Sequence, residues 1–189
     1  MLYFWKKEKI YKIVTFDFLS MKKIFLLLVA VAWCFSGCEK DDICDANTAT
    51  TPRLIIDFYD VTNPTIPKNV THLAVIGEGL TTYIEFDNVS KIQLPLKTTA
   101  DLSKYKFIIN YGNTTNPEIV NEDQLQFNYT RNNIFVSRAC GFKTTYILNT
   151  SSPFVLTDAA IPDNLWIKSV TLVQSNILNE NETHLKISH

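Results

Sequence analysis

Apolar and polar side chains alternate along most of the chain after Arg53. In the first such run, Leu54, Ile56 and Phe58 occupy alternate positions, and Asp57 lies between two of them. Because successive side chains of a β-strand point to opposite faces, this period-two pattern predicts half-buried strands. About nine short strands of this kind are expected before the chain ends.

Turn residues separate these runs. A Gly-Glu-Gly sequence at 77–79 predicts a hairpin turn, and Arg-Asn-Asn at 131–133 predicts another. Helical turns are expected at 101–104 and 117–123, and a long connection at 149–164. Short strands at this spacing, with 12 Phe and eight Tyr to fill the space between two sheets, predict an all-β fold, a single immunoglobulin-like β-sandwich.

A leader precedes the strands. Two lysines at 22–23 stand directly before twelve apolar residues, 24–35, a run too short to span about 30 Å of hydrocarbon as a helix. Two small residues follow and then Cys38, an arrangement typical of a lipobox, in which the cysteine thiol receives diacylglycerol and becomes the mature N-terminus. Phe35 stands where a lipobox usually has leucine. The sequence therefore predicts a lipoprotein signal peptide over 21–37 and lipidation of Cys38.

Other interpretations of the leader stay open. An A-x-A pattern at 30–32 fits ordinary signal-peptidase cleavage, which would release a soluble protein that starts at Trp33. A transmembrane anchor is less favoured, because the run is short and no basic flank follows it. Residues 1–20 fit no part of a leader, so translation is expected to begin at Met21, and the upstream stretch is expected to be a mis-called extension.

The cysteines indicate one disulfide. Cys34 lies in the leader and Cys38 is used for the lipid, which leaves Cys44 and Cys140 in an exported, oxidising compartment. A bridge between these two would join residues 96 positions apart, for which chain entropy gives about 4–5 kcal/mol of stabilisation. The alternative is two separate buried thiols, but Cys44 lies in a polar tether and has little reason to be buried alone. A disulfide is favoured, with a structural role, since the sequence has no Cys-x-x-Cys redox pair.

Charge argues against nucleic acid as a partner. Six of the 18 Lys and Arg residues and two of the 19 acids lie before Cys38, which leaves 12 basic and 17 acidic residues in the remainder. The clustered basic face expected of a protein that binds a phosphate backbone is therefore missing.

Catalytic and metal-binding patterns are also missing from the sequence. His72, His184 and His189 form no zinc motif, and His189, as the last residue, is expected to be frayed. The acids of the tether lack the spacing of a calcium loop. Asp57 and Asp60 are expected on the solvent face of a strand rather than as a catalytic pair. No metal, cofactor or enzymatic activity is expected.

Aromatic residues offer the remaining candidate site. Trp166 is surrounded by aliphatic residues and is expected to be buried. Tyr59, Tyr83 and Tyr111 could form an exposed row that binds a glycan or another small ligand, although core or edge packing is the favoured role.

Residues 38–44 resemble the mature start of small Bacteroidetes lipoproteins. A lysine followed by two acids looks like the export signal that sends such proteins to the outer face of the outer membrane, and this signal comprises Glu39, Lys40, Asp41 and Asp42. Thr-Pro-Arg-Leu at 51–54, Ile-Gln-Leu-Pro-Leu at 92–96 and Ala-Cys-Gly-Phe at 139–142 resemble landmarks of an uncharacterised family of such lipoproteins. The resemblance covers residues 38–187. It implies a pairing of Cys44 with Cys140 and offers no activity.

The sequence thus predicts one β-sandwich domain, 53–189, behind an acylated acidic tether, 38–52. The favoured hypothesis is a non-enzymatic lipoprotein, held on the outer membrane by its lipid, whose sandwich binds a protein partner such as an outer-membrane barrel or another envelope component. Binding of a glycan or small ligand is the second hypothesis, and hydrolysis by carboxylates that converge in a cleft is the third.

Overall fold

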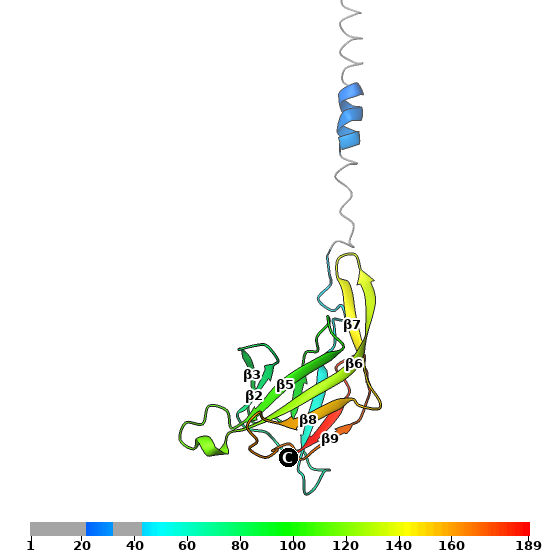
Figure 1. Ribbon diagram of the computed structural model, residues 1–189. Coiled ribbons are helices and arrows are strands. Elements are labelled where there is room, and N and C mark those ends of the chain that lie inside the picture. The colour runs from blue at the N-terminus through cyan, green and yellow to red at the C-terminus, as the bar shows by residue number, and fades with distance from the viewer. Residues whose placement is uncertain (1–21, 32–42) are drawn as a thin grey trace, which may run out of the picture. The chain divides into compact units, whose positions relative to one another are not determined.

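The computed structural model describes residues 22–31 and 43–189 (Figure 1). These residues belong to two compact units. The described part of the first unit contains a helix over 22–31, a short segment that ends at Asp45, and the turn 138–140. The second unit is the β domain, residues 46–137 and 141–189. Within the described residues, no helix is both long and apolar enough to cross a membrane.

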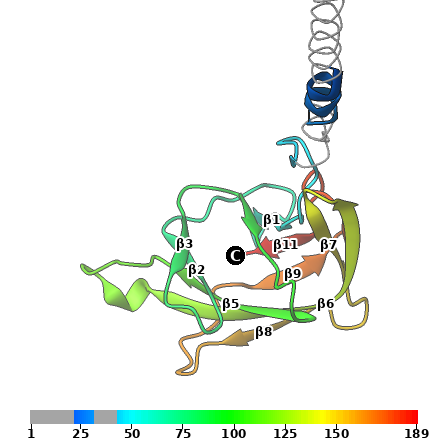
Figure 2. The ribbon, with the colours of Figure 1, turned by 90° about the horizontal axis from the view of Figure 1, so that it is seen from above.

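The β domain is a sandwich of two sheets, which confirms the predicted all-β fold. One sheet has four strands in the order β4 (Lys91–Leu94), β1 (Leu54–Tyr59), β11 (Leu185–Ser188) and β9 (Ser169–Leu172). The other has seven: β10 (Asn176–Ile177), β7 (Gly141–Leu148), β6 (Asn121–Ser137), β5 (Leu102–Ile109), β2 (Leu73–Gly77) and β3 (Tyr83–Phe86) follow one another, and β8 (Phe154–Asp158) pairs with β6. Figure 2 shows β5 and β6 in one layer and β1, β11 and β9 in the other.

Period-two burial builds the core between these sheets. Leu54, Ile56 and Phe58 of β1 have no exposed surface, and Leu125 and Phe127 of β6 face them from the other sheet as members of the same buried cluster. The strands pair antiparallel except for β1 and β11, which are parallel neighbours in the middle of the four-stranded sheet. The first and last strands of the domain therefore depend on each other.

Trp166 is buried, as its aliphatic neighbours predicted. Its indole Nε1–H donates a hydrogen bond of 3.1 Å to the backbone oxygen of Phe107, so the one polar atom of the ring is satisfied inside the core. The prediction that His189 is frayed is wrong. The His189 backbone N–H donates to the Tyr59 oxygen at 3.1 Å, and its ring packs edge-on against Phe58 and Trp166.

The turn predicted at 131–133 is wrong, because these residues lie inside β6, which runs for 17 residues. The turn instead occupies 138–140, and the polar triplet finds partners across the sheet: Asn133 Oδ1 accepts a hydrogen bond of 2.8 Å from Thr144 Oγ1. Beyond Asn128, β6 is no longer paired with β5 or β8. Residues 132–137 and 141–145 consequently form a two-stranded ribbon, called the arm here, which projects past the rest of the sandwich (Figure 1).

Three further local predictions differ from the structure or hold only in part. Residues expected to form a helical turn at 101–104 begin β5 instead. The 3₁₀ helix η2 (Pro117–Ile119) confirms the first part of the helical turn expected at 117–123, whereas residues 121–123 already belong to β6. The expected connection at 149–164 contains β8. The hairpin turn at 77–79 is confirmed between β2 and β3, where Gly79 has a φ of +81°.

Candidate functional site

The predicted disulfide is present. Cys44 and Cys140 are bonded, with their Cα atoms 4.9 Å apart. Cys140 is the last residue of the turn that joins the strands of the arm, so the bond ties this turn to Cys44, within the segment predicted as the tether. Cys38 and the residues predicted to form an export signal, Glu39, Lys40, Asp41 and Asp42, lie outside the described residues.

The three candidate tyrosines do not form one row. Tyr83 and Tyr111 are exposed and pack together, with ring centroids 4.8 Å apart and planes tilted by 55°. Tyr59 lies on β1, in the other sheet, and the Lys186 ammonium group sits 4.7 Å from the centre of its ring. The structure thus brings two of the three together.

A groove of about 360 Å³ lies on the inner side of the β2–β3 hairpin. Val75 and Ile84 are cross-strand partners on β2 and β3, so both side chains point to this inner face. Val75 is buried, whereas Ile84 remains 41% exposed and lines the groove together with Leu80, Tyr105 and Pro95. The groove is therefore an apolar part of the core face that is left open to solvent.

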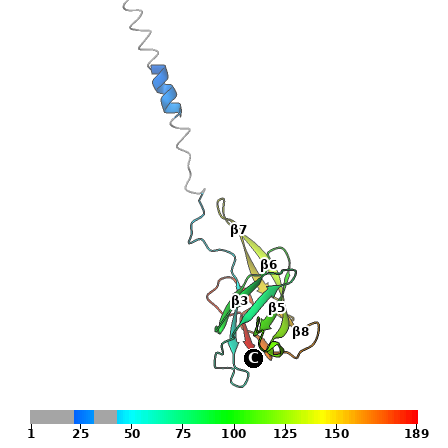
Figure 3. The same cartoon turned by 90° about the vertical axis from the view of Figure 1, so that its left-hand side faces the viewer.

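The β3 strand forms one border of this groove and is an edge of the seven-stranded sheet (Figure 3). All its register partners belong to β2, and its other side has no strand partner among the described residues. Such an edge presents backbone N–H and C=O groups that can pair with another extended chain. Lys104 and Glu78, which both line the groove, form an ion pair with 4.0 Å between Lys104 Nζ and Glu78 Oε1.

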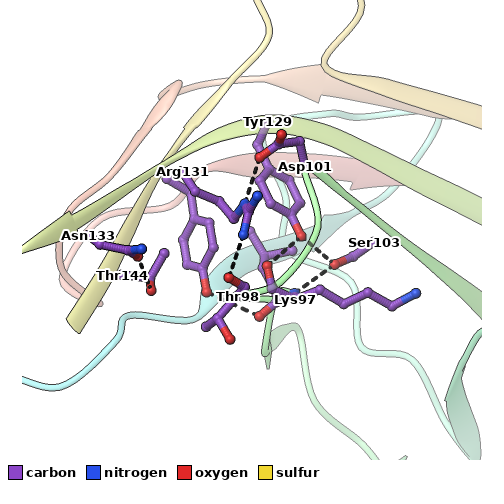
Figure 4. Close-up of polar contacts among 10 residues, drawn as sticks. Lys97, Thr98, Asp101, Ser103, Tyr129, Arg131, Asn133 and Thr144 are labelled. Carbon is purple, nitrogen blue, oxygen red and sulfur yellow. Dashed lines mark hydrogen bonds and ion pairs between the residues drawn. The ribbon is translucent and has the colours of Figure 1, made fainter. Parts of the chain in front are cut away.

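The opposite wall of the groove is held by a buried hydroxyl network (Figure 4). The Lys97 N–H donates to Ser103 Oγ at 2.9 Å, and the Tyr129 hydroxyl donates to the Lys97 oxygen at 3.0 Å. Ser103 Oγ and the Tyr129 hydroxyl oxygen are also 2.7 Å apart. The Tyr146 hydroxyl donates to the Leu96 oxygen at 3.1 Å. These bonds hold the chain after β4 against the sheet.

Arg131 adds charged hydrogen bonds next to this network. Its Nε donates to Asp101 Oδ1 and its Nη1 donates to the Thr98 oxygen, both at 2.6 Å (Figure 4). Burial raises the pKa of Tyr105 and of Tyr146 to about 12, so both hydroxyl groups remain protonated donors at neutral pH. The Tyr105 hydroxyl uses its proton on the Pro95 oxygen. The groove therefore has one rigid wall and one unpaired strand edge.

A buried carboxylate, Asp123, was not recognised from the sequence. It has no exposed surface, and its Oδ2 accepts a hydrogen bond of 2.7 Å from the Ile167 N–H, while its Oδ1 has no hydrogen-bond partner among the described residues. Loss of hydration raises the pKa of Asp123 to about 6, an effect that Asp158 and Asp163 increase and the Ile167 bond opposes. A signal existed: Asp123 lies in phase with Leu125 and so on the buried face of β6.

Asp57, Asp60 and His184, which the sequence analysis considered, each form hydrogen bonds with nearby groups of the domain. Asp57 Oδ2 accepts a hydrogen bond of 2.7 Å from Thr183 Oγ1. Asp60 follows β1 and accepts bonds from Thr62 and Asn63, which lower its pKa. His184 is buried and its Nδ1 accepts the Ile55 N–H at 2.9 Å. In the part of the chain that the structure describes, no group of three or more His, Cys, Asp or Glu residues could hold a metal ion.

Comparison with known proteins places the chain in a family. The sequence model of a family of unknown function (DUF6452) matches residues 70–189. The chain belongs to this family. The DUF6452 match includes the groove hairpin, the disulfide cysteine of the turn and the segments 92–96 and 139–142, but not 51–54. No curated protein and no solved structure matches the chain.

Proposed function

We propose that this DUF6452 protein is a lipoprotein of a Bacteroidetes outer membrane, anchored through Cys38, and that its sandwich binds a protein partner without catalysing a reaction. The groove beside the unpaired edge of β3 carries the binding part of this proposal. The leader, with its apolar run and small residues before Cys38, supports the anchor.

The geometry suits a partner segment in extended conformation. Such a segment gains affinity from backbone hydrogen bonds to the sheet edge and specificity from pockets that receive alternate side chains. A strand added beside β3 would point every second side chain toward Ile84 and the apolar groove. The intervening side chains would lie on the outer face, beside the paired rings of Tyr83 and Tyr111.

Site-specific photo-crosslinking in cells tests this binding mode. A benzophenone side chain in place of Tyr83 is expected to give one discrete adduct with an envelope protein, and a second change, Ile84→Asp, is expected to remove it by placing a charge in the groove. Ile161, which is 86% exposed in the loop after β8, is the matched control position. Absence of an adduct at Tyr83, or the same adducts from Ile161, would refute the proposal.

The anchor is tested separately. Labelled fatty acid should enter the protein, and Cys38→Ala should abolish the labelling and release the protein from the membrane fraction. If the Cys38→Ala protein fractionates like the wild type, the lipid anchor is refuted, and the alternative is a free periplasmic domain.

Glycan or small-ligand binding is the second candidate, because Tyr83 and Tyr111 offer two exposed rings in contact. Tyr111→Ala should then weaken binding to a glycan array, whereas Tyr59→Ala should not, since Tyr59 belongs to the other sheet. Equal effects of the two changes would exclude the ring pair as the binding site.

A further inference from the structure

The arm carries an exposed aromatic pair. Phe135 and Phe142 are cross-strand partners whose ring centroids lie 5.3 Å apart in a T-shaped arrangement. They are 56% and 69% exposed, respectively. Exposed phenylalanine pairs of this kind are uncommon on a domain surface that has water as its sole neighbour.

The pair continues the core face of the sheet beyond the core. Side chains that pair directly across two strands point to the same face, and every second pair repeats that face. Along β6 and β7, Tyr129 pairs with Leu148, and both side chains are buried in the core. The pair of Phe135 and Phe142 lies six residues further along the ribbon and so points to the same face. The two rings therefore lie on the inward-facing side of the sheet, at a place where no described strand of the four-stranded sheet covers them.

The charge of this part of the chain differs from that of the domain. Residues 124–157 contain Arg131, Arg138 and Lys143 and no Asp or Glu. Arg131 is neutralised by Asp101, whereas Arg138 and Lys143 form no ion pair within the described residues. Lys143 of the arm and Arg138 of the turn that joins its strands therefore carry positive charge on an otherwise acidic chain, which is complementary to anionic lipid headgroups.

Chain connectivity limits how far the arm can be from the lipid. Cys38 and Cys44 are six residues apart, which allows at most about 22 Å of extended chain. The disulfide adds 4.9 Å between Cα atoms, and Phe142 follows Cys140 by two residues, or about 7 Å. The Phe pair therefore cannot lie more than about 35 Å from the acylated residue.

We infer that the arm is a second membrane contact, in which Phe135 and Phe142 enter the interfacial region of the bilayer to which Cys38 is anchored. The inference rests on the proposed lipidation. Aromatic side chains with adjacent cations favour the headgroup boundary, where an apolar face is buried about 5–10 Å deep. One lipid anchor leaves a domain free to rotate, whereas a second contact fixes which of its faces points away from the membrane.

Fluorescence quenching by brominated lipid tests the contact on the acylated full chain in vesicles of phosphatidylcholine and phosphatidylglycerol. Phe142→Trp places a reporter on the arm, and Ile161→Trp is the matched control, since both side chains are largely exposed. The loop with Ile161 follows Asp158, which pairs with Asp123 at the other end of β6. The buried Trp166 gives the same background in both proteins.

Quenching of Phe142→Trp several-fold above that of Ile161→Trp is the expected result. Replacing both disulfide cysteines, Cys44→Ser and Cys140→Ser, should lower it toward the control, because the arm is then no longer tied near the anchor. Equal quenching at the two positions, or none at Phe142, would overturn the inference and leave a protein as the occupant of the arm.

Fatty-acid labelling of the same preparations separates the two proposals. Label at Cys38 with an unquenched Phe142→Trp reporter would overturn the arm contact alone. Absence of label would overturn the anchor and, with it, the arm contact.

Discussion

Asp123 makes the stability of the domain depend on pH in an unusual direction. Its carboxyl group has no exposed surface, and burial raises its pKa from 3.8 to about 6. Between these values the folded protein holds the proton and the unfolded chain does not. The free energy of unfolding therefore decreases as pH rises through this window, and above it the ionised group costs about 3 kcal/mol.

Asp123→Asn should remove this cost. The amide oxygen can still accept the Ile167 N–H at the position of Oδ2, and the amide N–H groups can donate toward Asp158 and Asp163. The variant should be about 2–3 kcal/mol more stable than the wild type at pH 7.5, and this difference should shrink toward zero near pH 4. Urea unfolding of the disulfide-bonded protein at several pH values measures the difference.

A control variant, Glu118→Gln, removes an exposed carboxylate of the 3₁₀ helix and should leave the pH profile unchanged. The reasoning would be refuted if Asp123→Asn were destabilising at pH 7.5. It would equally be refuted if the difference from the wild type were constant from pH 4 to pH 8, since a packing effect alone would not titrate.

Three other changes test the wall of the groove, the buried histidine and the disulfide. Ser103→Ala should cost about 1–3 kcal/mol in urea unfolding, because the Lys97 N–H loses its partner. His184→Ala should cost about 2–4 kcal/mol of unfolding free energy, because the Ile55 N–H loses its acceptor and a cavity is left. Burial lowers the pKa of His184 from 6.5, so the stability that His184 contributes should be full above pH 6.5 and decline as the pH falls below it. Reduction of the disulfide should speed tryptic cleavage after Arg138, followed by mass spectrometry, because the turn is then held only by its two strands; unchanged cleavage would show that the bond does not restrain the turn.

The strands with one buried face could be predicted from the sequence, and the arm could not. In β1, the alternation of Leu54, Ile56 and Phe58 predicted the strand and its core face, although Ile55 between them is also buried. In β6, Asn132 and Asn133 have the composition of a turn, but a long-range hydrogen bond to Thr144 makes them strand residues. No local pattern reports such a partner.

The groove was also beyond sequence reasoning. Ile84 alternates with its neighbours in the same way as a core residue, yet it remains 41% exposed and lines the groove. The disulfide was different: with only two cysteines left after the leader, the pairing followed from elimination and from the family resemblance. Asp123 could have been found from its phase with the apolar positions of β6.

The parallel pairing of β1 with β11 has a consequence for biogenesis. The Ile55 N–H bonds to His184, 129 residues later, and β1 pairs with β11 beside it. The central strand pair of the four-stranded sheet therefore cannot form until almost the whole chain has been synthesised. A chain that emerges N-terminus first would carry β1 as an exposed apolar segment throughout that time. Completion of the four-stranded sheet must therefore wait until the last strand, β11, has been synthesised.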